Sequence, residues 1–393
     1  MRLLTRYVLR EICQVFLVTL VSLTGLMILI GAVREAIAQG LGIPQIVLLL
    51  PYLLPNALVF AVPGTILFSV SSVYGRMSGA NEVLVLKSLG ISPMVILWPT
   101  LLLAVLLSFA TVWLNDLAMS WGYHGVQRVV IDALEDIAYG MLRAHHSYST
   151  PAFSVTVQRV KGRRLISPVF SLPSSDHSEP VTVRAESAEL RSNPGSGKLT
   201  IVLYNGRADG PGFHAEFPNQ EWEREIDIHP EAGGADSSPA HLSLSQIPSH
   251  IARQQESIQQ LEQRMVAQAG FRMATGDFDS LGGPSWVNDT REVQFQKYRL
   301  YRMQTELPRR WANGFSCLCF ALVGSGMAIR RKNADVLTSF FLCFGPILLV
   351  YYPFLFFGVD RAKAGAINPY AVWLANGILV LWGLWLVRRV IRY

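Results

Sequence analysis

The densest group of side chains that could do chemistry lies between residues 124 and 146. It contains three histidines and three carboxylates: His124, Asp132, Glu135, Asp136, His145 and His146. Imidazole and carboxylate groups together could bind a metal ion or transfer protons. The adjacent rings of His145 and His146 point to opposite sides of an extended chain, so both could reach one metal only across a turn. We therefore interpret the group as solvated surface and predict no catalytic residue, no metal site and no cofactor.

A second candidate is the stretch NPGSGKLT, which has the look of a phosphate-binding loop. That motif needs a glycine where Ser192 stands and a hydroxyl group after Lys198, where Leu199 stands. Because the required glycine and the required hydroxyl group are both missing, we interpret the stretch as a hairpin turn. The sequence contains no other nucleotide-binding motif, no HExxH motif and no nucleophile elbow.

A third candidate, residues 75–92, has the sequence GRMSGANEVLVLKSLGIS and lies between two long apolar stretches. It carries three charges: Arg76, Glu82 and Lys87. Each would cost roughly 3 kcal/mol at the centre of a bilayer, so the segment cannot extend either apolar stretch. Ser78 can cap the N-terminus of a helix, Glu82 falls in its first turn, and Gly90 suits the position after its last turn. The sequence therefore predicts a short amphipathic helix over 78–90, outside the membrane.

The elements around these candidates follow from the distribution of charge. Of the 393 residues, 51% are hydrophobic and 16% are charged, and six long windows carry no charge at all. Each is long enough to cross a hydrocarbon core of about 30 Å, which takes about 20 helical residues. The sequence thus predicts six transmembrane helices, within residues 12–33, 36–75, 88–115, 311–329, 336–359 and 364–387.

No ionisable side chain lies inside these spans, although proton relays and ion-coupled transporters usually need one. If the chain transports a substrate, its energy source would therefore lie in another chain. The four cysteines lie in or at the spans, and we interpret them as small apolar residues rather than disulfide or zinc ligands: Cys13, Cys317, Cys319 and Cys343.

Basic side chains flank the spans unevenly. With a cytoplasmic N-terminus, the inner side holds eleven Lys and Arg residues, against Arg34, Arg361 and Lys363 in the short outer loops. Cytoplasmic loops carry the excess of positive charge in membrane proteins. We therefore predict that both termini and helix 78–90 are cytoplasmic and that the long segment after the third span lies outside.

The first span could alternatively be a signal peptide, because Ala36-Ile37-Ala38 is similar to a cleavage site. The apolar run is longer than a typical signal core, and Arg34-Glu35 directly precedes the supposed site. Both features favour a retained membrane helix.

Residues 116–307 form an insert between the third and fourth spans. From Phe153 onward, apolar and polar residues alternate as in half-buried strands. Turn residues separate these strands: 173–179, 193–197 and Asn205-Gly206. The pattern predicts an all-β sandwich or roll. Between Asp116 and Arg310 the chain holds 20 basic and 23 acidic residues, a net charge of −3 against +6 for the whole chain, so the basic excess indicates no nucleic-acid surface.

A helix near 250–268 is predicted at the end of the insert. Its apolar side chains recur at heptad-like spacing: Ile251, Ile258, Leu261 and Met265. It is too short for an extended coiled coil, so we expect it to pack on the sheet or on a partner. A second polar helix, 293–306, leads into the fourth span, and residues 270–290 are predicted to be a loop.

Four stretches carry a resemblance that covers nearly the whole length. They are RYVLREICQVFLVTL, YLLPNALVFAVPGTILFSVSSVYGRMSGANEVLVLKSLGIS, VTVRAESAELRSNPGSGKLTIVLYNGRA and ELPRRWANGFSCLCFALVGSGMAIR. In these the chain resembles the permease subunits of the lipopolysaccharide-export ABC transporter, the LptF/LptG family. The region with Glu82, Leu86 and Gly90 is the most specific. The chain departs from the family where a proline is usual, at Asn313-Gly314 and at Gly326.

The resemblance implies a membrane α-helical fold of six transmembrane helices with an inserted periplasmic all-β, jellyroll-like domain. It places residues 1–115 and 308–393 in the bacterial inner membrane and residues 116–307 in the periplasm. It implies lipopolysaccharide, or a related glycolipid, as substrate and three kinds of protein partner: a second homologous permease, a dimeric cytoplasmic ATPase, and periplasmic β-jellyroll bridge proteins. It does not imply that this chain is an enzyme.

The resemblance also implies site residues. Helix 78–90 resembles the family's coupling helix, which docks in a groove of the ATPase. The coupling residues expected here are Asn81, Glu82, Leu86 and Gly90, with Glu82 pairing with a basic residue of the ATPase. For the phosphate groups of the lipid, Arg34 is the first candidate, because a guanidinium group binds phosphate bidentately. Arg309 and Arg310 are further candidates, and interfacial snorkelling is the alternative for all three.

Two other classes of function remain open on the residues alone. A membrane-anchored sensor or scaffold with a ligand-binding β domain would also lack catalytic groups, but six spans and a cytoplasmic helix are excessive for an anchor. An intramembrane enzyme acting on lipid would need a nucleophile or an acid pair, which the spans lack.

Overall fold

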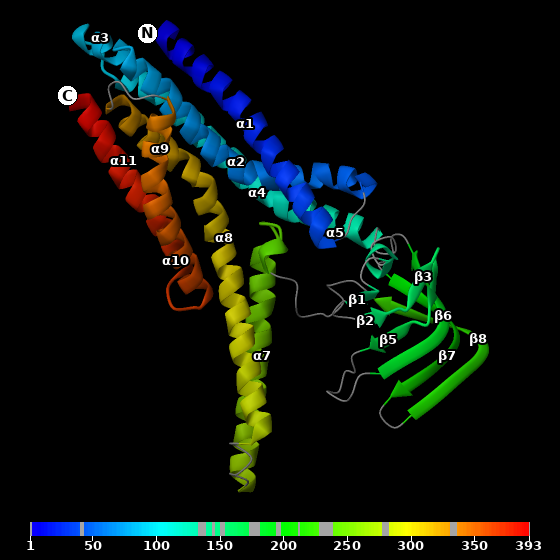
Figure 1. Cartoon of the computed structure of the whole chain (residues 1–393). Coiled ribbons are helices and arrows are strands. Elements are labelled where there is room, and N and C mark those ends of the chain that lie inside the picture. Colours follow the sequence, from blue (N-terminus) through cyan, green and yellow to red (C-terminus); the bar gives the residue numbers. More distant parts are fainter. Residues whose placement is uncertain are drawn as a thin grey trace. The chain divides into compact units, whose positions relative to one another are not determined.

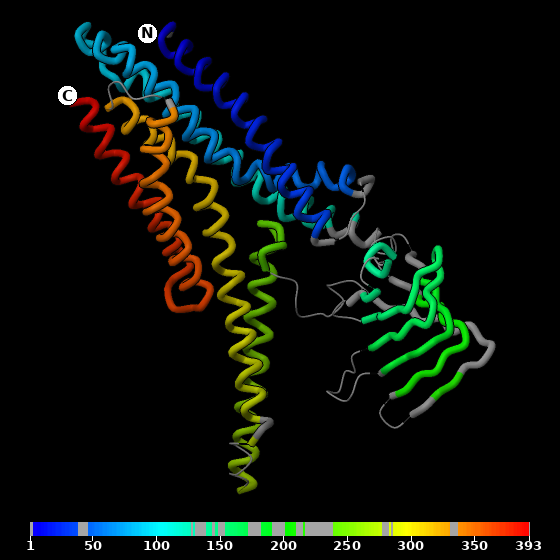
Figure 2. Tube along the Cα trace, in the orientation of Figure 1, coloured from blue at the N-terminus to red at the C-terminus, as the bar shows by residue number. Residues whose placement is uncertain are grey.

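The structure is a computed structural model in which the chain forms two compact units. The bundle unit comprises Met1–Met27, Leu54–Ser120 and Ser238–Tyr393, and the sheet unit comprises Ile28–Leu53 and Trp121–Ser237. The described residues, traced in Figure 2, are 2–39, 43–132, 139–143, 146–149, 154–172, 181–193, 198–210, 213–227, 239–276, 283–330 and 336–392.

Six helical segments are long and apolar enough to cross a membrane, as the charge-free windows predicted. The first, second and fourth lie in α1 (Arg2–Gln39), α2 (Ile43–Gly79) and α8 (Pro284–Arg330). The third runs from α4 (Met94–Leu117) through a π-helical turn (Ala118–Gly122) into α5 (Tyr123–Asp132). The fifth consists of α9 (Val336–Pro346), a π-helical turn (Ile347–Tyr351) and α10 (Tyr352–Lys363), and the sixth of a 3-10 turn (Pro369–Trp373) and α11 (Leu374–Arg392). The π-helical turn follows Pro346, whose missing N–H group interrupts the α-helical hydrogen bonds.

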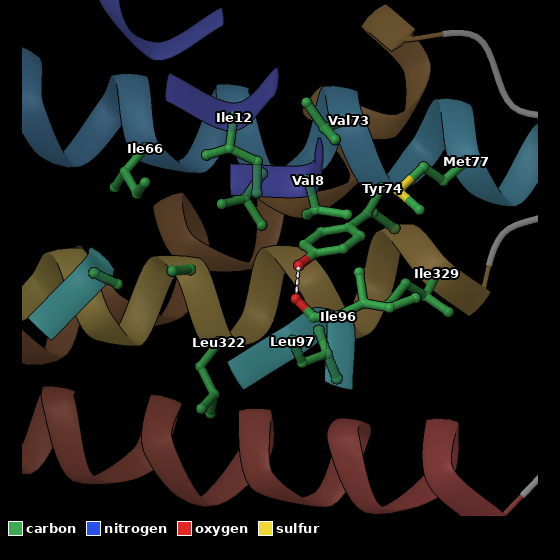
Figure 3. Close-up of a cluster of buried hydrophobic side chains, with 14 of the residues drawn as sticks. Val8, Ile12, Ile66, Val73, Tyr74, Met77, Ile96, Leu97, Leu322 and Ile329 are labelled. Atoms are coloured by element: carbon green, nitrogen blue, oxygen red, sulfur yellow. Dashed lines mark hydrogen bonds between the residues drawn. The ribbon is translucent and has the colours of Figure 1, made fainter. Parts of the chain in front are cut away.

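The end of the bundle unit where α1 begins and α11 ends, here the terminal end, also holds the short helix α3 (Glu82–Ser88) (Figure 1). A buried core lies there, to which α1 contributes Val8 and Ile12, α2 contributes Val73, Tyr74 and Met77, α4 contributes Ile96 and Leu97, and α8 contributes Ile329 (Figure 3). The hydroxyl group of Tyr74 donates to the Ile96 carbonyl oxygen at 2.9 Å and lies 2.5 Å from Thr100 Oγ1. The single polar group among these side chains is therefore satisfied.

Helices α4 and α8 cross closely at Gly314. A Cβ atom on Gly314 would lie 2.3 Å from Val112 Cγ2 and 3.0 Å from the Ser108 carbonyl oxygen. One turn further along α8, Cys317 Sγ lies 3.4 Å from Thr111 Oγ1. Cys317 is a buried free thiol, as predicted. Small residues let membrane helices approach to backbone distance, so Gly314 sets the separation of this pair.

The helix predicted near 250–268 is longer than expected. Helix α7 runs from Ile247 to Thr275 and packs along the first half of α8. Gln254 Nε2 lies 2.5 Å from Gln296 Oε1, and Lys297 Nζ lies 2.7 Å from Glu262 Oε1, both between α7 and α8. The predicted polar helix 293–306 is a part of α8 itself. The prediction of a loop over 270–290 is wrong up to Thr275, where α7 ends, and from Pro284, where α8 begins, and residues 277–282 lie outside the described residues.

The sheet unit contains one curled antiparallel sheet (Figure 1). Its eight strands are β1 (Ser147–Ser149), β2 (Ser154–Thr156), β3 (Arg159–Lys161), β4 (Arg164–Ile166), β5 (Val169–Leu172), β6 (Val181–Asn193), β7 (Lys198–Gly210) and β8 (Phe213–Asp227). The long strand β6 pairs with both β5 and β4 along one side and with β7 along the other, and β7 pairs with β8. The predicted alternation is observed in β6, where Val183 and Ala185 are buried on either side of exposed Arg184, whereas Ile201, Val202 and Leu203 of β7 are all buried.

Two predicted turns of the insert have different outcomes. Asn193 pairs with Lys198, so β6 and β7 form the hairpin that we expected in place of a phosphate-binding loop; residues 194–197 lie outside the described residues. Asn205-Gly206 is not a turn. It is a β-bulge inside β7, where Asn205 adopts φ 52° and donates to Glu186 Oε2 at 2.9 Å. Asparagine tolerates the left-handed conformation in a bulge as well as in a turn, which explains the wrong prediction.

A tyrosine holds the sheet together from one face. The hydroxyl group of Tyr139 accepts from the Leu190 N–H group at 2.9 Å and donates to the Arg163 carbonyl oxygen at 2.5 Å. Its ring is buried with Leu142 and Val155. Helix α5 (Tyr123–Asp132) packs in the same unit on the beginning of α2, where Leu49 is fully buried.

Candidate functional site

The predicted amphipathic helix is present as α3, but it is shorter than 78–90. Ser78 does not cap it; Ser78 lies in the last turn of α2 and donates its hydroxyl hydrogen to the Ile329 carbonyl oxygen of α8 at 2.8 Å. The chain turns at Asn81, which adopts φ 61° and makes no side-chain cap. Because Asn81 is left-handed, the turns before it belong to α2 and α3 starts at Glu82.

The end of α3 follows the prediction. Gly90 adopts φ 75°, its N–H group donates to the Lys87 carbonyl oxygen, and the Ile91 N–H group donates to the Leu86 carbonyl oxygen, both at 3.0 Å. These bonds form a Schellman motif, which requires a left-handed residue and therefore favours glycine. The following helix α4 starts beyond Ser92-Pro93, and Ser92 Oγ accepts from the Met94 N–H group at 3.3 Å.

Three contacts fix α3 and the end of α2 to the other helices of the bundle unit. Val83 is buried in the core of the terminal end, and Leu86 packs against it. Lys87 Nζ donates to the Val390 carbonyl oxygen of α11 at 2.7 Å. Arg76, in the last turns of α2, pairs with Glu11 of α1. With the Ser78 bond to α8, a displacement of α3 would act on α1, α8 and α11 together.

The other face of α3 is apolar and exposed. Leu84, Val85 and Leu89 have relative exposures of 51%, 55% and 69%. Of the predicted coupling residues, Asn81 and Gly90 are exposed and Glu82 is half-buried, whereas Leu86 packs against the core. Apolar side chains gathered on one exposed face outside a membrane are typical of a docking surface.

Arg34 lies in the sheet unit, on the second half of α1, and its side chain is exposed. Four apolar side chains of the same helix form a shallow open hollow with it: Leu29, Ile30, Val33 and Ile37. A guanidinium group beside apolar side chains can contact a phosphate while acyl chains cover its surroundings.

The other two basic candidates are engaged by the protein. Arg309 Nε and Nη2 donate to Glu306 Oε2 at 3.1 and 2.7 Å, and Lys363 Nζ lies 3.7 Å from Glu306 Oε1. Arg310 has 1% of its side chain exposed and pairs with Asp116 at 3.4 Å. The side chain of Arg309 therefore remains partly exposed, while the guanidinium group of Arg310 donates to acceptors of the protein itself.

Sequence reasoning did not select Asp116, Glu306 or Lys363. A signal for Asp116 and Arg310 was present, because Asp116 directly follows the third charge-free window and Arg310 directly precedes the fourth. Opposite charges at the same ends of two neighbouring antiparallel spans can pair. Which spans are neighbours depends on tertiary packing, which the windows do not give.

The titratable group between 124 and 146 forms no site in the part that the structure describes. His124 and His146 are exposed, and Glu135, Asp136 and His145 lie outside the described residues. Within the described residues, no three His, Cys, Asp or Glu side chains are grouped so that they could hold a metal ion.

Comparison with known proteins identifies the family. The family model described as lipopolysaccharide export system permease LptF/LptG matches residues 6–389, from the first turns of α1 to the last turns of α11. Nothing matched in a comparison with curated proteins. The matched range includes the six apolar helices, the curled sheet and α3. The chain therefore belongs to the LptF/LptG family of lipopolysaccharide export permeases.

Proposed function

We propose that this permease extracts lipopolysaccharide from the inner membrane together with a second homologous permease, driven by a separate ATPase that binds α3. In this proposal the terminal end of the bundle unit faces the cytoplasm and the sheet unit lies in the periplasm. The eleven basic residues on the terminal side support that orientation. Permease subunits of this family are not enzymes themselves, and the proposal assigns ATP hydrolysis to the partner.

The observation that carries the proposal is the division of α3 into two faces. One face holds Leu84, Val85 and Leu89, which a groove of the ATPase would cover. The opposite face packs on the core through Val83 and is bonded to α11 through Lys87, while Ser78, in the last turn of α2 just before α3, is bonded to α8. A movement of the groove would therefore reach the transmembrane helices without any reaction in this chain.

Glu82 is the proposed electrostatic contact. It stands in the first turn of α3 and is half-buried, and the proposal pairs its carboxylate with a basic side chain of the ATPase. A hydrogen bond to a charged partner contributes roughly 1.5 to 3 kcal/mol, which is enough to set the register of a docked helix.

For the substrate, Arg34 is the proposed contact to a lipid phosphate, with the apolar hollow of α1 against the acyl chains. Lipid would then pass to the curled sheet, whose buried face is apolar. Among the described strands, β8 pairs only with β7, so its other edge is open for a bridge protein to add a strand.

The direct test is Glu82→Ala in the complex purified with its ATPase. We expect normal membrane insertion and continued ATP hydrolysis, with lipid release per ATP reduced about tenfold or more, as the loss of one charge-assisted contact allows. Glu256→Ala, on the exposed side of α7, is the control for the loss of a carboxylate. Normal release by Glu82→Ala would exclude the coupling role.

A further inference from the structure

A strap of chain, residues 239–246, is held between α4 and α8. Arg310 of α8 donates from Nη2 to the carbonyl oxygens of Ala240 and Leu242, at 2.8 and 2.7 Å. Asp116 of α4 accepts from the Leu244 N–H group at 2.6 Å and from Arg310 Nη1 at 3.4 Å. The five groups form one clamp, in which each charged side chain binds both the other and the strap.

The charged side chains of the clamp are largely buried, Arg310 most of all. Arg310 is 1% exposed and Asp116 31% exposed. A buried guanidinium group is costly unless an anion and hydrogen-bond acceptors surround it. Arg310 obtains its acceptors from the strap and its anion from the neighbouring helix, while the adjacent Glu306 is already paired with Arg309 and Lys363.

In the sequence, the residues of the clamp lie next to the two points where the chain leaves the bundle unit for the sheet and returns from it. The chain leaves the bundle unit for the sheet after Ser120 and returns to the bundle unit at Ser238. Asp116 lies just before the first of these points, and the strap begins just after the second. The clamp therefore ties together both connections that bracket the sheet, residues 121–237.

Helix α8 connects the clamp with the terminal end. It is continuous from Pro284 to Arg330, and its Ile329 carbonyl oxygen accepts from Ser78, next to α3. Gly314, one turn from Arg310, keeps α8 against α4. A displacement of α8 at the terminal end would therefore be carried along one rigid element to Arg310.

We propose that the Asp116–Arg310 clamp is the positioning device by which α8 moves the two connections of the sheet during transport. This inference rests on the proposed function, since it gives the clamp a role in ATP-driven release. Arg310 is then a positioning residue that acts through the strap, not a ligand of the lipid phosphate.

The first experiment compares Asp116→Asn and Arg310→Lys with the wild type, as the complex with its ATPase. Asp116→Asn keeps the shape of the side chain and an acceptor for Leu244 but removes the anion from Arg310. We expect amide exchange of residues 240–246 to become about tenfold faster, with β6 and β7 unchanged, and release per ATP to fall by a similar factor. Glu262→Gln, which removes the anion of the exposed Glu262–Lys297 pair between α7 and α8, is the matched control and should change neither.

The second experiment separates transmission from folding. Asp116→Cys and Leu244→Cys, in a Cys13→Ala background, replace the clamp by two thiols that a short cleavable crosslinker can join. We expect low release per ATP before crosslinking, restored release after it, and loss again on reduction. A defect that is reversed in the same molecules by one covalent link is not a failure to fold.

Two kinds of result would overturn the inference. Wild-type exchange of the strap in Asp116→Asn would show that the clamp does not hold it and would overturn the inference. Faster exchange with unchanged release, or a crosslink that restores nothing, would reduce the clamp to a structural contact and also overturn it. If the wild type and Glu262→Gln release no lipid on ATP hydrolysis, the proposed function fails, and the clamp has no transport to assist.

Discussion

Gly314 controls how closely α8 approaches α4. Its missing side chain leaves room for Val112 and for the Ser108 carbonyl oxygen, which is backbone and cannot move aside as a side chain end can. We expect Gly314→Ala to destabilise the protein by roughly 1 to 3 kcal/mol, the usual cost of forcing a methyl group into a packed site. The thermal midpoint of the purified protein in detergent would fall accordingly.

The matched control for this prediction is Gly345→Ala in α9, where a Cβ atom would meet nothing within 4 Å. Both variants add the same methyl group to a membrane helix, so a difference between them reports the α4–α8 contact. Equal midpoints for the two variants would contradict the close crossing.

Single residues differed in how well the sequence predicted them. Gly90 was predicted at its position because a left-handed residue after a helix has a strong and local preference. Ser78 was wrongly predicted as a cap because the same residue type can bond a distant carbonyl oxygen, here that of Ile329. The pairing of Arg310 with Asp116 joins residues 194 positions apart, and no local pattern encodes such a contact.

At the scale of elements, α7 and the first half of α8 form a hairpin with its own small core. Ile258 of α7 is 5% exposed. We expect Ile258→Ala to cost roughly 2 to 5 kcal/mol of local stability, because the lost side chain leaves a cavity between the two helices. Limited proteolysis should then cut residues 247–283 faster, while the membrane helices stay protected.

The control for the hairpin is Val266→Ala on the same helix. Val266 is 72% exposed and contributes little to the contact with α8. Protease susceptibility equal to the wild type is expected for it. If Ile258→Ala were cut no faster than Val266→Ala, the hairpin would not depend on this contact.

The elements themselves were largely predictable where one strong physical signal dominates. Absence of charge located the six spans, and period-two alternation located β6 and β7. The hairpin was missed because heptad spacing in 251–265 shows that a helix has an apolar stripe but not which surface covers it. The start of α3 was missed because Asn81 adopts a conformation that most residues avoid, and α2 continues to Gly79 as a result.

At the scale of the whole molecule, the proposed transport depends on one path, by which a displacement of α3 reaches the clamp. Docking at α3 acts through Ser78 on α8, and α8 carries the displacement to the clamp at Arg310. The family supplies the substrate class. In this proposal every step of the route is a mechanical displacement, so the permease needs no reacting group of its own.

The most direct measurement of this account is site-specific photocrosslinking from the exposed face of α3 in intact cells. A photoreactive residue replaces Leu89, which is 69% exposed, and a second variant carries it at Val266 of α7. We predict that the Leu89 variant is joined to an ATP-binding subunit, identified by mass spectrometry, and that the Val266 variant is not. An α3 that crosslinks only to periplasmic proteins, or equally from both positions, would contradict the central claim.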